Sequence, residues 1–213
     1  MNRIKHFFRE AVAWFVRVHM YVGMMIGFRP KFHYVDKSRQ SRRLKGPALI
    51  IANHTAFYDP PMVWSVFPHS DVRTIAGEVL YEDKRLKWLL TQCRCIRIDR
   101  GAIDMTCTRE ILGQLKEGRC IGIFPEGKMN TPENGILPFH SGTALFAAMA
   151  NVPVIPVYIA KKYEILGHRQ HIVIGTPYEL TSRAMTPDNL QLQADAMRNI
   201  MLGMKESLEK GEI

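Results

Sequence analysis

Cysteine is scarce in this chain of 213 residues, and its four cysteines are not spaced as a disulfide framework. They are Cys93, Cys95, Cys107 and Cys120. Cys-x-Cys is too short for a zinc motif, and the two histidines of His168-x-x-His171 straddle a loop and a strand. The sequence therefore predicts free thiols, a reducing compartment and no metal site.

The chain also lacks the usual sequence features of a hydrolase with a covalent intermediate and those of a protein with several domains. It has no Gly-x-Ser-x-Gly elbow and no cysteine next to a histidine, which removes the obvious covalent nucleophiles. It has no Pro/Gly-rich stretch, no low-complexity stretch and no internal repeat. A chain of this length suits one α/β domain with a sizeable core.

Acidic residues are rare near the N-terminus. Residues 1–50 hold eleven Lys or Arg and two acidic residues, whereas residues 51–213 hold 18 of each sign. All of the formal net charge of +9 therefore lies in the first segment. Nucleic acid, a membrane surface and an acidic protein would all attract such a segment, so its pattern must decide between them.

The pattern favours a membrane surface. On a helical wheel, the large apolar side chains of residues 3–26 gather on one side and the charged ones on the other. The apolar side carries Ile4, Phe7, Phe8, Ala11, Trp14, Phe15, Val18, Val22 and Met25, and the opposite side carries Lys5, His6, Arg9, Glu10 and Arg17. Aromatic residues beside a basic face are typical of a helix that lies in a bilayer interface. We therefore predict a monotopic anchor and no nucleic-acid partner.

Three further interpretations of this segment stay open. Residues 11–28 could be a transmembrane span or a signal peptide, but Arg17 and His19 interrupt the apolar run near its centre and no small-residue cleavage site follows. The helix could also pack its apolar side on its own core. A basic connection follows, which we expect to touch anionic lipid. It contains Arg39, Arg42, Arg43 and Lys45.

From residue 48, apolar runs alternate with helical patterns. Strands are predicted at 48–52, 73–76, 95–98, 120–124, 153–159 and 171–174, and helices at 60–67, 83–92, 104–117, 141–150 and 187–210. This alternation predicts an α/β sandwich with a largely parallel sheet, preceded by the amphipathic anchoring helix. We divide the chain into an anchoring segment, 1–45, and one domain, 46–213. Two prolines in the strand at 153–159 predict an edge position or an irregularity.

The polar residues 53–61 follow the buried strand at 48–52, at the end of a strand where open α/β sheets bind substrates. His54 and Asp59 can form one hydrogen-bonded unit there if the turn folds back. The carboxylate would then fix the ring's tautomer, and the ring could act as a general base on a hydroxyl. The alternative is structural, because Asp59 before Pro60 is also a good helix N-cap.

The pattern Asn-His-x4-Asp in residues 53–59 resembles the first motif of the glycerolipid acyltransferases, which include the bacterial lysophosphatidic acid acyltransferases. Three more blocks resemble that family's motifs in the same order: Ile96–Arg100, Phe124–Gly127 and Val152–Val157. The resemblance spans residues 48–159. It implies transfer of a fatty acyl group from acyl-CoA or acyl carrier protein to a lysophospholipid hydroxyl, without a cofactor, at the cytoplasmic face of the cell membrane. The implied acceptor is 1-acylglycerol-3-phosphate, and the product is phosphatidic acid.

The resemblance also implies roles for individual residues. His54 would be the general base and Asp59 its partner, and Arg100, Glu126, Gly127 and Lys128 would bind substrate. We expect direct attack on the thioester, with backbone amides near the turn stabilising the oxyanion.

The chain departs from the family where Arg94 replaces a usual glycine, where Lys128-Met129-Asn130 replaces threonine, arginine and serine, and where His140 replaces a lysine. These departures leave a different lysolipid acceptor open. The sequence is also compatible with a thioesterase or lipase-like hydrolase and with a non-catalytic membrane-binding module.

Overall fold

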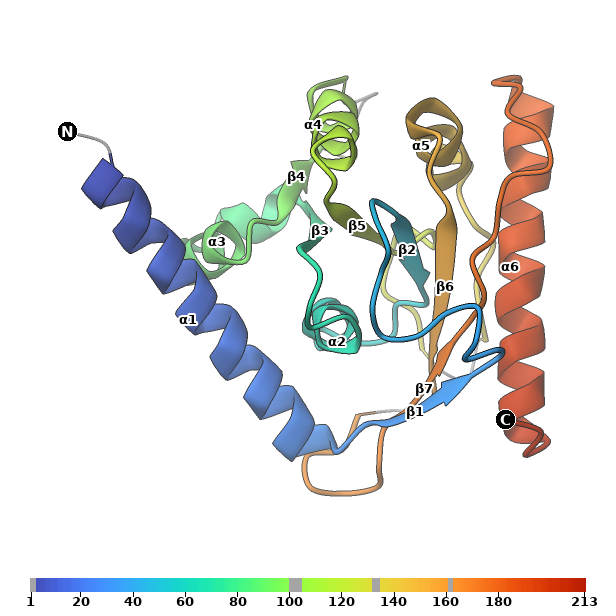
Figure 1. Cartoon of the computed structure of the whole chain (residues 1–213), viewed down its shortest axis with the longest axis horizontal. Coiled ribbons are helices and arrows are strands. Elements are labelled where there is room, and N and C mark those ends of the chain that lie inside the picture. Colours follow the sequence, from blue (N-terminus) through green and yellow to red (C-terminus); the bar gives the residue numbers. More distant parts are fainter. Residues whose placement is uncertain (1–2, 100–104, 132–134, 161–162) are drawn as a thin grey trace.

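A computed structural model describes residues 3–99, 105–131, 135–160 and 163–213. Within these residues, seven strands form one sheet, with helices on both of its faces (Figure 1). The strands are β1 (Lys31–Tyr34), β2 (Leu49–Ala52), β3 (Val72–Gly77), β4 (Ile96–Ile98), β5 (Cys120–Ile123), β6 (Val154–Ile159) and β7 (His171–Ile174). The helices are α1 (Arg3–Phe28), α2 (Asp59–Val66), the 3₁₀ helix η1 (Glu78–Tyr81), α3 (Lys84–Gln92), α4 (Met105–Lys116), α5 (Gly142–Ala150) and α6 (Pro187–Glu209). The predicted α/β sandwich is confirmed.

The strand order is β1-β7-β6-β2-β5-β3-β4. Five of these strands run parallel, whereas β7 lies antiparallel to β6 and β1 parallel to β7. The largely parallel sheet was therefore predicted correctly, but strand β1 was missed. Its sequence, Lys-Phe-His-Tyr, contains no apolar run. The division of the chain at residue 45 stays a prediction, although the first segment contributes this edge strand to the sheet.

The proline-containing strand was predicted to lie near an edge or to carry an irregularity, and it does not lie at an edge. β6 lies inside the sheet, between β7 and β2. The carbonyl of Pro156 accepts from Gly175 N–H at 2.8 Å, so the missing donor of Pro156 also points toward β7. The β6–β7 register begins at Val157 and Ile174, so Pro156 lies opposite Gly175, the residue that follows β7. Pro156 therefore costs only the last hydrogen bond of this ladder, at the point where β7 ends.

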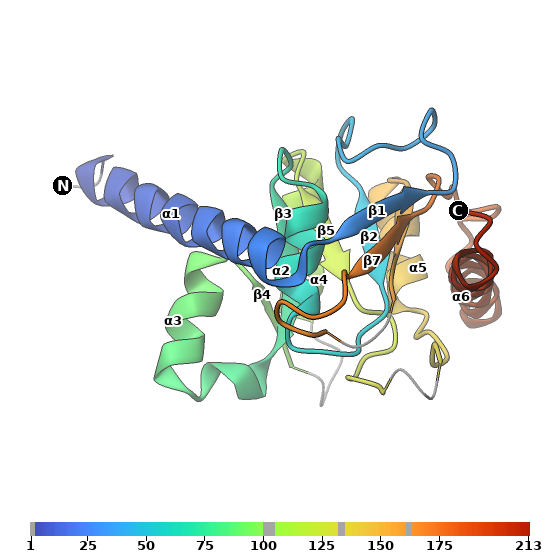
Figure 2. The same cartoon turned by 90° about the horizontal axis from the view of Figure 1, so that it is seen from below.

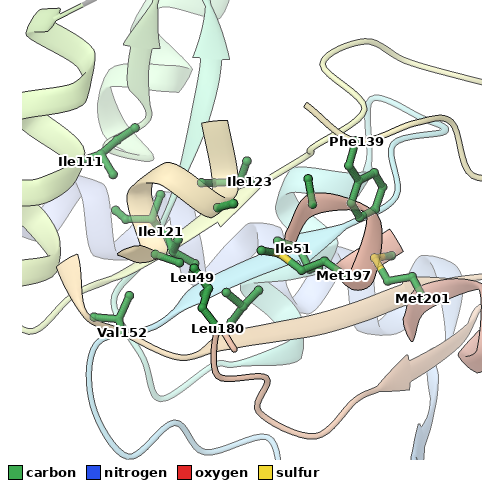
Figure 3. Packing of buried hydrophobic residues seen from close by; sticks show 14 of the residues in the cluster. Leu49, Ile51, Ile111, Ile121, Ile123, Phe139, Val152, Leu180, Met197 and Met201 are labelled. Carbon is green, nitrogen blue, oxygen red and sulfur yellow. The ribbon is translucent and has the colours of Figure 1, made fainter. Parts of the chain in front are cut away.

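The core lies on both faces of the sheet because alternate residues of each strand point to opposite sides. In β2, Leu49 and Ile51 join the cluster that contains residues of α4, α5 and α6 (Figure 3), whereas Ile50 and Ala52 join the one that contains residues of α1 and α2. All four are buried. A strand that is buried on both faces has a continuous apolar sequence, which is why β2 could be predicted from the sequence.

Helix α1 lies along one side of the domain (Figures 1 and 2). Two of its charged residues, Glu10 and Arg17, contact the domain. Arg17 Nη1 donates to Asp71 Oδ1 at 2.9 Å, and Arg17 Nη2 donates to Val72 O at 3.3 Å. Glu10 pairs with Arg94. Arg94 adopts φ +57°, a left-handed conformation that favours glycine, which is the residue that the family usually has here. This departure therefore gives α1 an ion pair with the domain.

The aromatic side of α1 faces away from the domain, whereas Met24 and Phe28 pack on its core. Phe7, Phe8, Trp14, Phe15 and Ile26 are 55 to 68% exposed. Residues Glu10–Phe28 are long and apolar enough to cross a membrane, by length and composition. The described part of α1 therefore does not bury its aromatic side in its own core, which was one of the interpretations left open by the sequence.

Part of the basic connection has a structural role. Arg42 donates to the carbonyls of Val66 and Ser65 at 2.9 and 2.7 Å, at the C-terminal end of α2. Its guanidinium also lies over the Phe32 ring, at 3.9 Å from the centroid. A cation at the last carbonyls of a helix is favourable. Lipid contact therefore remains a prediction for the rest of the basic residues in this connection.

We predict that Asn53→Ala lowers the free energy of unfolding by about 2 to 4 kcal/mol, because it leaves buried backbone groups unpaired. Asn53 is buried; its side chain donates to Ile159 O at 2.9 Å and accepts from Ile159 N–H at 2.8 Å, so it joins the end of β2 to β6. Urea unfolding measures the loss. Asn199→Ala, at an exposed position on α6, is the control. A loss below about 0.5 kcal/mol would contradict the prediction.

Candidate active site

The predicted site residues meet because β2 and β5 are parallel neighbours. Ile51 lies opposite Ile123, so the segments that follow the two strands leave the same edge of the sheet. There, His54 N–H donates to Glu126 Oε1 at 2.9 Å, and Asn130 N–H donates to His54 O at 2.8 Å. The backbone of His54 is thus held on both sides by the segment after β5.

The turn between β2 and α2 folds back, as expected, and brings Asp59 to His54. Asp59 Oδ2 accepts from His54 Nδ1 at 2.9 Å and from the N–H groups of Thr55 and Ala56 at 2.6 and 2.7 Å. The Asp59 side chain is 0% exposed, so these three donors offset the cost of burying its charge. The residue at the N-cap of α2 is Tyr58, and it makes no side-chain cap. The carboxylate thus serves the turn and the imidazole instead of capping the helix.

The imidazole of His54 has a fixed orientation. An ionised carboxylate can only accept hydrogen bonds, so Nδ1 of His54 carries the proton and Nε2 is left as the acceptor. The ring stacks on Phe124, with centroids 4.4 Å apart and planes 26° apart. Its side chain is only 16% exposed. This is the arrangement that a general base needs.

His54 lines a cavity of about 460 Å³ whose walls are mainly apolar. The apolar residues that line it include Phe57, Trp64, Leu80, Leu89, Leu90, Ile98, Phe124, Met129 and Phe146. Gly127 and His140 also belong to the lining. The cavity therefore places an oriented base beside enough apolar surface to hold a hydrocarbon chain.

Glu126, predicted to bind substrate, bonds to the protein itself. Besides the N–H of His54, its oxygens accept from Leu137 N–H at 3.0 Å and Asn130 Nδ2 at 3.2 Å. Burial raises the pKa of Glu126, while the hydrogen bonds from His54, Leu137 and Asn130 act in the opposite direction. Glu126 is 2% exposed and does not belong to the cavity lining within the described residues. Its contacts indicate a role in holding His54.

The remaining predicted substrate-binding residues differ in position. Gly127 has φ +69°, and a Cβ there would lie 2.8 Å from His140 Cδ2, so glycine permits the turn and the approach of the imidazole. Lys128 is exposed and, within the described residues, is not part of the cavity lining. Arg100 lies outside the described residues.

Tyr163 and Asn130 are two contributors that sequence reasoning missed. The Tyr163 hydroxyl and Asp59 Oδ1 are buried and, in the part of the chain described, have no hydrogen-bond partner. Burial raises the pKa of Tyr163 well above its usual range, and the charge of nearby Asp59 raises it further. The Tyr163 hydroxyl therefore lies near the Asp59 carboxylate. Asn130 was visible only as a departure from the family motif, and no local pattern marks Tyr163.

The cysteines are poor nucleophiles. All four are free thiols. Cys93 and Cys95 line the cavity, yet burial raises their pKa to about 12 and about 11. The thiolate is the reactive form, so these thiols stay protonated and unreactive at neutral pH.

Comparison with known proteins agrees with this geometry. The chain is 26% identical to the 1-acyl-sn-glycerol-3-phosphate acyltransferase of Saccharomyces cerevisiae, over 74% of this chain and 55% of that protein. It is 30% identical to the lyso-ornithine lipid O-acyltransferase of Pseudomonas aeruginosa, over 61% and 49%. The chain thus spans about half the length of these curated relatives.

The crystal structure of the 1-acyl-sn-glycerophosphate (LPA) acyltransferase PlsC from Thermotoga maritima has the same fold. Its TM-score is 0.69 at 18% identity, with 97% of this chain and 83% of that chain covered. A family model described as Acyltransferase matches residues 29–160, more than half of the chain. The protein therefore belongs to the acyltransferase family.

Proposed function

We propose that the protein moves a fatty acyl group from a thioester, on coenzyme A or acyl carrier protein, to the free hydroxyl of a lysophospholipid. The acceptor is 1-acylglycerol-3-phosphate and the product is phosphatidic acid. The observation that carries this proposal is the His54–Asp59 pair at the wall of an apolar cavity. The apolar cavity can hold an acyl chain, and the His54 imidazole can take a proton from a hydroxyl group. The name of the yeast relative supports the acceptor.

The reaction follows from the orientation of the imidazole. His54 Nε2 takes the proton of the acceptor hydroxyl while the hydroxyl oxygen attacks the thioester carbonyl. Asp59 stabilises the positive charge that the ring gains. The tetrahedral intermediate then collapses: its C–S bond breaks, the ester remains, and the leaving thiolate takes the proton back from His54. Because attack is direct, the reaction needs no acyl-enzyme and no cofactor.

The oxyanion needs donors that the protein does not already use. The N–H groups of His54, Thr55 and Ala56 all donate to protein carboxylates. The N–H groups of Lys128 and Met129 have no acceptor within the described residues, and they follow the Gly127 turn, which lines the cavity with Met129. We therefore assign oxyanion stabilisation to these two amides.

The acceptor's head group is the part of the proposal that depends most on individual residues. A phosphate would be bound by Arg100 through two parallel hydrogen bonds and by Lys128 as a less directional charge. His140, beside Gly127, occupies the position where the family usually has a lysine. One relative acts, by its name, on a lyso-ornithine lipid. A panel of lysolipids, with products identified by mass spectrometry, is therefore the central experiment.

We also propose that the protein is monotopic and lies at the cytoplasmic face of the membrane. The exposed aromatic side of α1 would lie in the bilayer interface. Arg17 faces Asp71, so it adds little attraction to anionic lipid. The remaining basic residues near the N-terminus supply that attraction.

We predict that His54→Ala abolishes acyl transfer in a folded protein, because no second group is placed to take the proton. Asp59→Asn should lower kcat at least about 100-fold, since a neutral amide cannot stabilise the positive charge that the ring gains and no longer fixes its tautomer. Mass spectrometry with and without acceptor separates transfer from thioester hydrolysis. Near-normal transfer by a well-folded His54→Ala protein would sink the mechanism.

We predict that Glu126→Gln lowers kcat about 10- to 100-fold and changes the KM of either substrate by less than about twofold, because the amide group of glutamine opposes an N–H donor and displaces His54. Steady-state kinetics with both substrates measure this. Glu82→Gln, at an exposed position, is the control. If the KM for the lysolipid rises while kcat holds, Glu126 binds substrate instead.

We predict that the double change Phe8→Glu and Phe15→Glu weakens binding to anionic vesicles about 100-fold or more, because two exposed apolar side chains leave the lipid. Co-sedimentation measures binding, and Met185→Glu, 60% exposed and outside α1, is the control. Equal binding by the double variant would contradict the interfacial anchor. Retention of the unaltered protein after alkaline carbonate extraction would indicate a span.

A further inference from the structure

A tight turn at Glu164–Gly167 exposes two large apolar side chains. Gly167 N–H donates to Glu164 O at 3.2 Å, which closes the turn. Ile165 and Leu166 are 66% and 67% exposed. Leu166 has φ +57°, a conformation that glycine or asparagine adopts more cheaply than leucine. A leucine at this position indicates that its apolar side chain serves a purpose outside the turn.

The turn is attached to the C-terminal end of α1. Leu166 N–H donates to Gly27 O at 2.7 Å, and Arg29 Nη2 donates to Leu166 O at 3.3 Å. Gln170 N–H donates to Phe28 O at 3.0 Å. Figure 1 shows this connection, between β6 and β7, beside the lower end of α1. The two apolar side chains therefore continue the exposed side of α1, where Ile26 is 63% exposed.

We propose that the Glu164–Gly167 turn is a second membrane-contacting element, which inserts Ile165 and Leu166 into the bilayer interface that α1 occupies. This inference rests on the membrane anchoring proposed for α1. The surroundings of the turn suit a lipid surface: Arg29 and Arg169 are exposed beside it, where they would meet lipid phosphates if the turn inserts, and Glu164 is paired with His168 at 2.8 Å.

A second contact does what α1 cannot do alone. The aromatic side of α1 restrains the domain along one line of contacts only, whereas a helix and a separate point define a plane. The turn follows Tyr163, whose hydroxyl lies near Asp59 and whose ring centroid lies 4.9 Å from that of Phe28. Anchoring the turn would therefore fix the orientation of the His54–Asp59 pair relative to the membrane.

The test places an environment-sensitive fluorophore on Ile165→Cys in the full chain. The matched control is Leu192→Cys, 64% exposed on α6. Labelled unsubstituted protein gives the background from the native cysteines. With vesicles of phosphatidylcholine and phosphatidylglycerol, we expect the emission at position 165 to shift to the blue and to be quenched by lipid-borne quenchers, and the emission at position 192 to stay that of water.

The same pair of positions tests affinity. Ile165→Glu should weaken vesicle binding about tenfold or more and Leu192→Glu should not, because only the first loses apolar burial in lipid. An aqueous emission at position 165 on vesicle-bound protein would overturn the proposal, as would failure of the protein to bind vesicles. Neither readout depends on turnover, so a protein that inserts the turn but transfers no acyl group would refute the proposed function alone.

Discussion

The buried carboxylate of Asp59 is the constraint on which the site depends. One of its oxygens accepts from the His54 ring and from two backbone N–H groups of the turn. A charge so deeply buried is tolerated only when donors surround it, and these donors hold it in place. The same contacts that make the carboxylate tolerable also fix the turn, the imidazole and its tautomer. Structural and chemical roles therefore cannot be separated at this residue.

The sheet holds the backbone of His54, as Asp59 holds its side chain. His54 follows β2 and Glu126 follows β5, and the two segments meet because these strands are parallel neighbours. Glu126 then accepts the N–H of His54, and the N–H of Asn130 reaches the carbonyl of His54. The base is thus held by its side chain through Asp59 and by its backbone through the segment after β5. Rigid support of this kind keeps a reacting group within the narrow geometry that catalysis needs.

In the N-terminal helix, charged and aromatic residues have different roles. Arg17 and Glu10 face the domain and pair with Asp71 and Arg94. The aromatic side faces outward, whereas Met24 and Phe28 of the same helix pack on the core of the domain. Part of the basic character that first suggested a lipid surface therefore attaches the helix to its own domain. Binding to the membrane would then depend on the exposed aromatic side of the helix and on the remaining basic residues near the N-terminus.

Local sequence determined much of this protein. The helices at 59–66, 84–92, 105–116, 142–150 and 187–209 lie within one residue of their predicted ends, because their periodicity and caps are local properties. The six predicted strands were found because most of their residues are apolar, and the spacing of His54 and Asp59 suggested the turn that joins them. Arg100 was also predicted from a motif in the sequence, but it lies outside the described residues, so its role stays a prediction.

Only the tertiary structure decided the rest. Strand β1 was missed because Lys-Phe-His-Tyr is not an apolar run, and it pairs only because β7 is beside it. Pro156 lies inside the sheet at the level where β7 ends, so its missing donor costs only the last hydrogen bond of that ladder. Glu126 and Tyr163 acquire their roles from partners distant in sequence. These outcomes depend on which strand ends become neighbours, and a pattern read along one chain does not contain that information.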